Sequence, residues 1–400
     1  MWHSVRARRT SIRPQRLVVT KARWLHGARS PVVLMIDDLT NAWHAAEGGA
    51  SWRLGGDWGG GLDAPNSALS FLEKHLLAEF PEVRTTFFVV AGEISAYTNH
   101  QPFSFAAPMD ATEESRRFFR KLSDDDRFEL AYHGFNHGTA GPTTEQFLQE
   151  WRGFATPSAA AAQTRDGLAI FERATGRIPR GGKYGGWDYN SFAGDVVNDC
   201  GFLWWCRDWM PRDVSGRTAD AYYEPELFGN NLVVALPSTV HGYFWQARQI
   251  NTLLSEGQVI GIEEHIAPTR PDGLVQTPNI VDDIGELRRL FGYLRTKKVW
   301  YANCSDIAAY VVARDRSILH DVTVDGFSVR YEGRVERPLL TLCIDASALC
   351  DSARPHIVVD LPEGGELANT DYRFDELEYR HMVTLPLMTG RYRVSSAPLA

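Results

Sequence analysis

The sequence predicts an α/β fold: a (β/α) barrel of about seven parallel strands, distorted from the TIM type, followed by an antiparallel β-sandwich. Short apolar segments alternate with helical segments between residues 31 and 316, as in parallel strands that are joined by helices. Several of these apolar segments end in Asp or His. From residue 317 the helical pattern stops, and short alternating segments are separated by Gly, Pro and Asp, which is typical of a β-sandwich.

The expected barrel strands are continuous apolar runs, which indicate burial on both faces. They are Val33–Ile36, Thr85–Ala91, Phe128–Tyr132, Phe202–Cys206, Leu232–Leu236, Gln258–Ile262 and Val299–Ala302.

The expected helices combine apolar periodicity with capping residues, such as Asp110 with Glu113, Thr143 with Gln146, and Pro157 just after Thr156. They are Ser67–Phe80, Asp110–Leu122, a helix that opens at Thr143, Thr156–Gly176, Ser191–Cys200, Asn279–Thr296 and a helix that ends near Ala313.

The chain of 400 residues is long enough for more than one domain. We expect a basic extension over residues 1–30, the barrel over 31–316 and the β-sandwich over 317–400. Residues 1–30 carry eight Lys or Arg and no acid, and no apolar segment of a secretory signal follows them. We therefore expect a cytoplasmic protein. No apolar run is long enough for a transmembrane helix.

Composition excludes some functions. A net charge of −8 and a pI near 5.9 argue against a general nucleic-acid-binding protein. The five cysteines have irregular spacing, which predicts neither a disulfide framework nor a zinc ribbon.

The long glycine-rich loop 47–63 carries Trp52 and Trp58, and loops of this length more often have a function than not.

A candidate metal site follows two of the expected strands. Asp37 and Asp38 end the first, and His133 and His137, four residues apart, follow Tyr132. Adjacent carboxylates point in opposite directions on an extended chain, so one could bind a metal while the other takes a proton. One carboxylate and two imidazoles suit Zn²⁺, with Co²⁺, Ni²⁺ or Fe²⁺ as alternatives. Three protein ligands leave coordination positions open for water and substrate.

Further chemically active side chains also lie at or beyond strand ends. His265 follows Gln258–Ile262 closely, Asp208 and Trp209 follow Phe202–Cys206, and Lys183 lies in a turn-rich loop. Because the C-terminal ends of parallel barrel strands share one rim, we expect these side chains to meet the metal site there.

The order of these motifs resembles a known family. An Asp-Asp pair, a His-x-x-x-His about 95 residues later, a Thr-Gly-x-x-Pro loop before Lys183, an Asp-Trp pair and a strand-end His are similar to the polysaccharide deacetylases of carbohydrate esterase family 4, or NodB-homology domain. The resemblance spans residues 31–313. It implies a hydrolase that removes N- or O-acetyl groups from a saccharide with one divalent metal ion, most simply zinc.

The resemblance also implies roles for individual residues. Asp38, His133 and His137 match the metal ligands, Asp37 the general base and His265 the general acid. Lys183 falls where the family has an arginine that positions the base, and Asp208 where an acid pairs with that cation. The residues expected to contact the substrate are Tyr184, Gly186, Trp209 and Trp58.

The sequence departs from the family at two motifs. Met35 and Ile36 precede the aspartates in place of a hydroxyl residue and Phe, and Lys183 to Gly186 replace Arg-Pro-Pro-Tyr. Lysine cannot hold a carboxylate with two parallel bonds, as arginine does.

Two other interpretations stay open. The same site could hydrolyse cyclic amides or imides, or the chain could be a carbohydrate-binding pseudoenzyme that uses Trp43, Trp52, Trp58 and Trp209. A homo-oligomer is also open.

Overall fold

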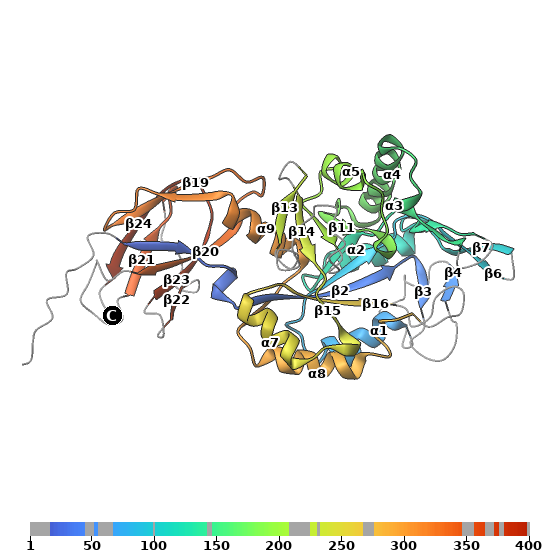
Figure 1. Ribbon diagram of the computed structural model, residues 1–400, viewed down its shortest axis with the longest axis horizontal. Coiled ribbons are helices and arrows are strands. Elements are labelled where there is room, and N and C mark those ends of the chain that lie inside the picture. Colours follow the sequence, from blue (N-terminus) through green and yellow to red (C-terminus); the bar gives the residue numbers. More distant parts are fainter. Residues whose placement is uncertain are drawn as a thin grey trace, which may run out of the picture. The chain divides into compact units, whose positions relative to one another are not determined.

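The computed structural model describes residues 17–44, 52–54, 67–98, 101–141, 146–207, 225–229, 233–266, 276–345, 356–364, 372–375 and 380–397. The chain divides into two compact units (Figure 1). Unit 1 contains Met1–Gly27 and Val312–Ala400, and unit 2 contains Ala28–Val311. Among the described residues, no helix has the length and apolar character needed to span a bilayer.

Unit 2 is built on one ten-stranded sheet in the order β13-β14-β12-β11-β8-β5-β2-β16-β15, with β17 also paired to β2. All pairs in it are parallel except that of β13 with β14. The strands are β2 (Ser30–Leu39), β5 (Thr85–Val89), β8 (Phe128–Tyr132), β11 (Gly181–Lys183), β12 (Trp204–Arg207), β13 (Glu226–Phe228), β14 (Val233–Pro237), β15 (Val240–His241), β16 (Ile260–His265) and β17 (Val299–Tyr301). This large, mostly parallel sheet confirms the α/β prediction.

Contacts between strands that are not neighbours show that the sheet curls. Sγ of Cys206 on β12 lies 3.8 Å from Sδ of Met35 on β2, although three strands separate them in the sheet. The rings of Phe88 on β5 and Trp204 on β12 also meet, with centroids 5.9 Å apart. The sheet is therefore consistent with a distorted barrel, in which these side chains fill the interior.

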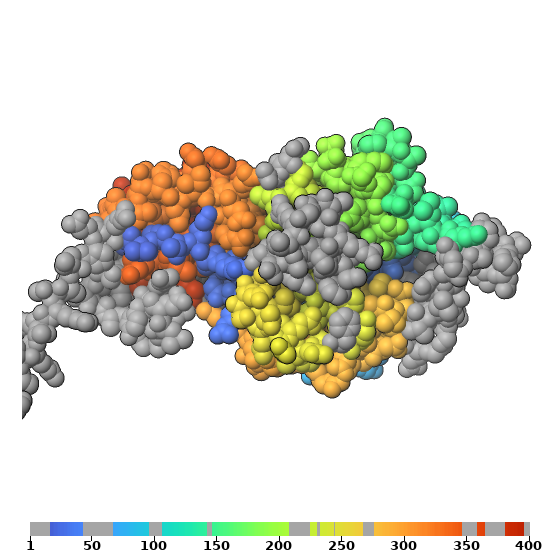
Figure 2. Space-filling view, in the orientation of Figure 1, coloured from blue at the N-terminus to red at the C-terminus, as the bar shows by residue number. Residues whose placement is uncertain are grey.

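Helices cover the outside of this sheet. Figure 1 shows α7 and α8 on one side of the strands and α2, α4 and α5 on the other, and in Figure 2 the yellow residues of α7 lie at the surface. The helices are α1 (Ala68–Leu72), continued by the π-helical turn Glu73–Leu77, α2 (Glu113–Ser123), α3 (Glu150–Gly153), α4 (Pro157–Thr175), α5 (Ala193–Asp199), α7 (Ala247–Glu256), α8 (Ile284–Arg295) and α9 (Cys304–Asp315).

Local sequence explains how two of these helices begin and end. Thr156 caps α4, Pro157 occupies its first turn, and Gly176 ends it at a φ of 77°. At α2 the cap differs from the expected Asp110: Thr112 and Ser115 form the capping box.

The predicted helix opening at Thr143 is wrong over its described part. Leu148–Gln149 forms β10, which pairs with β9 (Gly138–Thr139), and only Glu150–Gly153 is helical. Residues 142–145 lie outside the described part of the chain. In the observed hairpin, the backbone of the loop after β8 is paired with β10, so its polar groups have hydrogen-bond partners.

Unit 1 has two four-stranded antiparallel sheets, which confirms the antiparallel character expected of the C-terminal region. Their strands are β1 (Val18–Lys21), β20 (Leu339–Asp345), β23 (Arg380–Pro386) and β22 (Tyr372–Asp375) in one sheet, and β18 (Ser317–His320), β19 (Gly326–Tyr331), β24 (Gly390–Ala397) and β21 (His356–Asp360) in the other.

Part of the expected basic extension belongs to unit 1. Val18–Lys21 pairs antiparallel with β20, and the backbone of Leu17 bonds to Thr323. The segment is rich in β-branched residues, which favour a strand once a partner edge is available. The extension over 1–30 is therefore corrected for residues 17–27, and residues 1–16 lie outside the description.

Candidate metal centre

A backbone irregularity at the end of β2 brings Asp37 and Asp38 into one site. Along β2, Val32, Leu34 and Ile36 join the core under the helices, whereas Met35 faces the barrel interior. Asp37 continues the interior face, but the pairing of β2 with β5 shifts register after Ile36. Asp38 has a φ of 64°, which aspartate tolerates better than most residues. The two carboxylates therefore do not point in opposite directions, as an extended chain would require.

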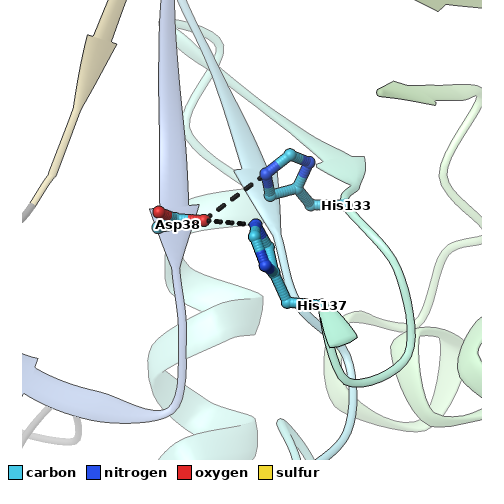
Figure 3. A group of neighbouring side chains, drawn as sticks. All are labelled: Asp38, His133 and His137. Carbon is cyan, nitrogen blue, oxygen red and sulfur yellow. Dashed lines mark ion pairs between the residues drawn. The ribbon is translucent and has the colours of Figure 1, made fainter. Parts of the chain in front are cut away.

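Three side chains converge at this point (Figure 3). Oδ1 of Asp38 lies 3.4 Å from Nε2 of His133 and 3.2 Å from Nε2 of His137. All three candidate ligand atoms lie within 4.8 Å of one another. Tetrahedral ligands with bonds of about 2.1 Å are separated by about 3.4 Å, so the observed spacing fits a single divalent ion.

Neighbouring groups orient both imidazoles. Nδ1 of His133 lies 3.2 Å from the carbonyl oxygen of Lys183, so Nδ1–H donates there and Nε2 is free to bind a metal. At position 185 a Cβ would lie 3.1 Å from the ring of His137, so glycine leaves room for that ring. His133 is buried, whereas the side chain of Asp38 is 31% exposed, which leaves one side of the group accessible.

The ligand atoms also stabilise one another electrostatically. Burial would raise the pKa of Asp38, but His137 and His133 hold this pKa well below its usual range. Burial would lower the pKa of His137, but the charge of Asp38 raises it. A metal ion therefore competes with a proton for His137.

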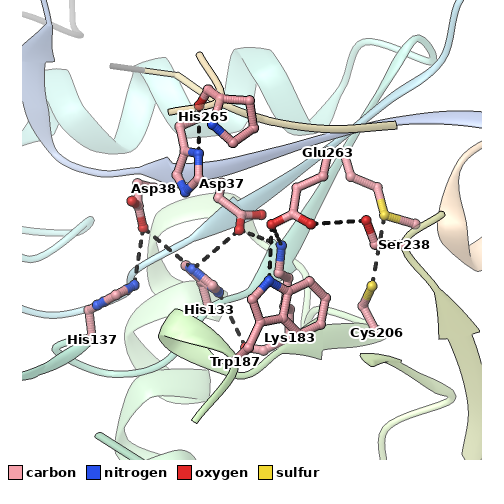
Figure 4. Close-up of polar contacts among 12 residues, drawn as sticks. Asp37, Asp38, His133, His137, Lys183, Trp187, Cys206, Ser238, Glu263 and His265 are labelled. Atoms are coloured by element: carbon pink, nitrogen blue, oxygen red, sulfur yellow. Dashed lines mark hydrogen bonds and ion pairs between the residues drawn. The ribbon is translucent and has the colours of Figure 1, made fainter. Parts of the chain in front are cut away.

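Beside this group, Lys183 forms an ion pair with the carboxylate of Asp37 (Figure 4). Its Nζ also donates to Oε1 of Glu263 at 2.9 Å, and all three side chains are at least 95% buried. Burial would lower the pKa of Lys183, but the two carboxylates raise it above its usual value. Burial would raise the pKa of Glu263, but Lys183 lowers it to about 2. One buried cation, the ammonium group of Lys183, therefore forms ion pairs with two carboxylates.

Glu263 and Trp187 are functional candidates that the sequence analysis missed. The expected partner of Lys183, Asp208, lies outside the described residues, and Glu263 is the partner observed. Glu263 also accepts hydrogen bonds from Nε1 of Trp187 at 3.1 Å and from Oγ of Ser238 at 3.0 Å. The indole ring of Trp187 covers Lys183, with Nζ 4.0 Å from the ring centroid. The alternation of β16 was an available signal, because it places Glu263 on the same face as His265.

His265 ends β16 directly opposite Asp37 of β2. Its Nδ1 lies 2.7 Å from the carbonyl oxygen of Pro278, so Nδ1–H donates to that oxygen. This bond fixes the ring and leaves Nε2 as the atom that can exchange a proton. Figure 4 shows the ring beside Asp37 and Asp38.

The structure places two of the predicted substrate contacts, Tyr184 and Gly186. The ring of Tyr184 is buried in an aromatic cluster, with centroids 4.5 Å from Tyr189, 5.2 Å from Trp151 and 5.1 Å from Trp205. We therefore correct Tyr184 to a core residue, since it follows Lys183 and alternation turns it to the opposite face of the sheet. Gly186 is exposed, with a φ of 58°, and its contact with substrate stays a prediction.

The side chains of the remaining aromatic candidates lie outside the described part of the structure. Trp58 and Trp209 lie outside the described residues, and so do the side chains of Trp43 and Trp52.

No known protein-family profile matches this chain, and no curated protein matches it. Solved structures do match it over roughly 70% of its length. A putative polysaccharide deacetylase from Mycobacterium smegmatis is 17% identical, with a TM-score of 0.44, over 74% of this chain and 94% of that one. Puue allantoinase is 15% identical, with a TM-score of 0.42, over 72% of this chain and 92% of that one. A CE4 family pseudoenzyme from Bacillus anthracis is 14% identical, with a TM-score of 0.32, over 70% of this chain and 65% of that one.

Identities and TM-scores this low say nothing about the chemistry of this chain, which its own side chains must support.

Proposed function

We propose that this protein is a metal-dependent hydrolase that removes acetyl groups from a saccharide. One juxtaposition carries the hydrolase part of the proposal: an Asp-His-His group lies beside Asp37. Oδ2 of Asp37 is held by Lys183, whereas Oδ1 is buried with no hydrogen-bond partner among the described residues. Nε2 of the ligand His133 lies 4.0 Å from Asp37. The saccharide part rests on the order of motifs in the sequence.

Asp38, His133 and His137 would hold the metal ion. The donor set, one carboxylate oxygen and two imidazole nitrogens, suits Zn²⁺ best and also accepts Co²⁺, Ni²⁺ or Fe²⁺. When bound, such an ion supplies Lewis acidity and lowers the pKa of water at the site.

Asp37 is the group best placed to accept a proton from the attacking water. Its Oδ1 accepts no hydrogen bond from any residue that the structure describes, and the bond from Lys183 to Oδ2 fixes the plane of the carboxylate. Glu263 and Trp187 in turn hold Lys183 from the other side. The chain thus fixes its base through a buried cation rather than through solvent-exposed contacts.

His265 is the group best placed to protonate the leaving nitrogen or oxygen. Its Nδ1–H is committed to Pro278, so a proton carried at Nε2 is the one that can be transferred. Acid–base steps of this kind contribute rate factors of about 10² to 10⁴ each.

The test is acetate release from a panel of N- and O-acetylated oligosaccharides, measured on wild type with added Zn²⁺ and with chelator. Asp37→Asn should lower turnover by about 10² or more while the protein still binds one metal ion. Asp124→Asn makes the same chemical change at an exposed position and should have no effect on turnover. Asp37→Asn with wild-type turnover would show that Asp37 is not the base.

The same assay separates the other interpretations. Products from cyclic amides or imides without acetate release would assign a different C–N bond. Stoichiometric saccharide binding with no product from any substrate would favour a pseudoenzyme.

A further inference from the structure

The loop that carries His137 is folded around a buried carboxylate of the protein itself. The backbone N–H of Phe135 donates to Oε1 of Glu150 at 3.0 Å. The N–H groups of Asn136 and His137 donate to Oε2 at 2.9 and 3.0 Å. Three consecutive N–H groups that converge in this way form a nest, a backbone geometry that binds anions. In this protein the anion is the Glu150 side chain, which is 5% exposed.

Glu150 and His137 are bonded in both directions. The N–H of Glu150 donates to the carbonyl oxygen of His137 at 3.1 Å, in addition to the bond from the N–H of His137 to the carboxylate. The two residues flank a short hairpin in which Gly138 pairs with Gln149. Both backbone polar groups of His137 are therefore satisfied by one residue, which leaves little freedom in the position of its Cα.

The loop adopts backbone angles that it would not choose by itself. His137 has a φ of 64°, a left-handed conformation that is uncommon for residues other than glycine. Gly134 has a φ of 112°, and a Cβ at this position would lie 2.6 Å from Oε2 of Glu150. The loop is thus shaped to close on this carboxylate, and an unusual backbone persists only where its surroundings impose it.

We propose that Glu150 is a positioning residue for the metal centre: by binding three loop N–H groups, it imposes the backbone that directs Nε2 of His137 toward Asp38. This inference rests on the proposed metal site and adds a residue to it. Glu150 does not contact the metal or the substrate. It acts through the geometry of His137, so its loss should change metal affinity more than fold stability.

The decisive variant is Glu150→Gln, which keeps the size of the side chain but turns an NH₂ group toward at least one loop N–H. The matched control is Glu129→Gln. Glu129 is a half-buried carboxylate, and it accepts hydrogen bonds from Thr86 Oγ1 and the N–H of Ser305, both at 3.0 Å. It lies four residues before His133, about 13 Å away along β8.

The measurement is the Kd of Zn²⁺ for metal-free protein, by chelator competition well below the unfolding temperature, together with the absorption spectrum of the Co²⁺ form. We expect Glu150→Gln to weaken Zn²⁺ binding by about 10- to 100-fold and to alter the Co²⁺ bands. Glu129→Gln should leave both within twofold of wild type, even where it lowers the unfolding temperature. Gly134→Ala disturbs the same contact from the loop side and should weaken binding in the same direction.

Each other outcome decides against the proposal. Wild-type affinity in Glu150→Gln would show that the nest does not position His137. Equal weakening in Glu150→Gln and Glu129→Gln would mark a general loss of structure. A Glu150→Gln protein that cannot be recovered folded even with excess Zn²⁺ would make Glu150 a determinant of the fold. A wild type that binds no metal would instead refute the proposed function itself.

Discussion

The triad of Lys183, Asp37 and Glu263 offers the sharpest test of how the site is held. Lys183→Met keeps the length of the side chain but removes the only charge that the two carboxylates share among their described contacts. The side chains are 1%, 5% and 4% exposed, so water cannot replace the lost cation. Removing one partner of a buried ion pair costs about 3 to 5 kcal/mol, and two stranded carboxylates place this variant at the upper end. For a unit of this size the unfolding temperature should fall by roughly 10 °C or more.

The assay is calorimetric and denaturant unfolding of metal-free protein, so that metal binding does not add to the stability. The matched variants are Glu263→Gln and Lys183→Met/Glu263→Gln. The double variant lacks one of the stranded charges, so its loss of stability should be smaller than the sum of the single losses by about 1 to 3 kcal/mol. A Lys183→Met protein that unfolds within about 2 °C of wild type, or strictly additive losses, would refute this account of the triad.

The pH dependence gives a second, independent readout of the same triad. The pKa of Glu263 is depressed to about 2, so its contribution is present above the unfolded value of about 4.3 and is lost as pH falls toward 2. In Lys183→Met, burial acts on Glu263 without the cation and raises this pKa. The variant should therefore gain stability as pH falls from about 7 to 5, which is the opposite sign to the wild-type trend at lower pH.

Three further predictions concern neighbouring residues. Burial, with the charge of Asp283 nearby, raises the pKa of Glu264 well above its usual value, so the contribution of Glu264 to stability is lost as pH rises through this raised pKa. Glu264→Gln should therefore gain stability relative to wild type as pH increases from 5 to 9. The same change of unfolding free energy with pH in both proteins would contradict this. Trp187→Phe loses the N–H bond to Glu263 and should lower the free energy of unfolding by about 1 to 2 kcal/mol, measured in denaturant, with an unchanged value counting against the bond. His265→Ala should lower turnover by about 10² to 10⁴ at unchanged metal stoichiometry, and loss of the metal would show that His265 has another role.

Much of this site could be predicted from the sequence because the pattern of apolar residues marks where the strands end. A run of apolar residues that stops at Asp37, Tyr132 or Ile262 marks the rim of a parallel sheet, and the structure brings Asp37, His133 and His265 together there. Long helices with clear caps, such as α4, were predictable for the same reason: their signals are local.

What the sequence did not reveal depends on geometry that is not local. The left-handed backbone of Asp38 coincides with a register shift against β5, and no sequence pattern around residue 38 predicts it. Glu150 lies in a segment whose cap and spacing suggested a longer helix, and its role follows from a loop that ends 13 residues earlier. Val18–Lys21 joins β20 across more than 300 residues, a pairing that local propensity cannot predict.

Strand alternation would have identified Glu263 and excluded Tyr184. The alternation of β16 places Glu263 on the face of His265, and the same alternation after Lys183 turns Tyr184 away from the site. Strand periodicity therefore carries information about roles as well as about burial.

The proposed hydrolase activity depends on one divalent ion held by Asp38, His133 and His137. Calorimetric titration of metal-free protein with Zn²⁺ tests it most directly, in wild type, in His137→Ala and in the surface control His320→Ala. We expect one site per chain in wild type and in His320→Ala, and a loss of at least about 100-fold in affinity in His137→Ala, because removal of a direct ligand should cost more than the 10- to 100-fold typical of a residue that only supports a ligand. Unchanged Zn²⁺ binding in His137→Ala, or none in wild type, would contradict it.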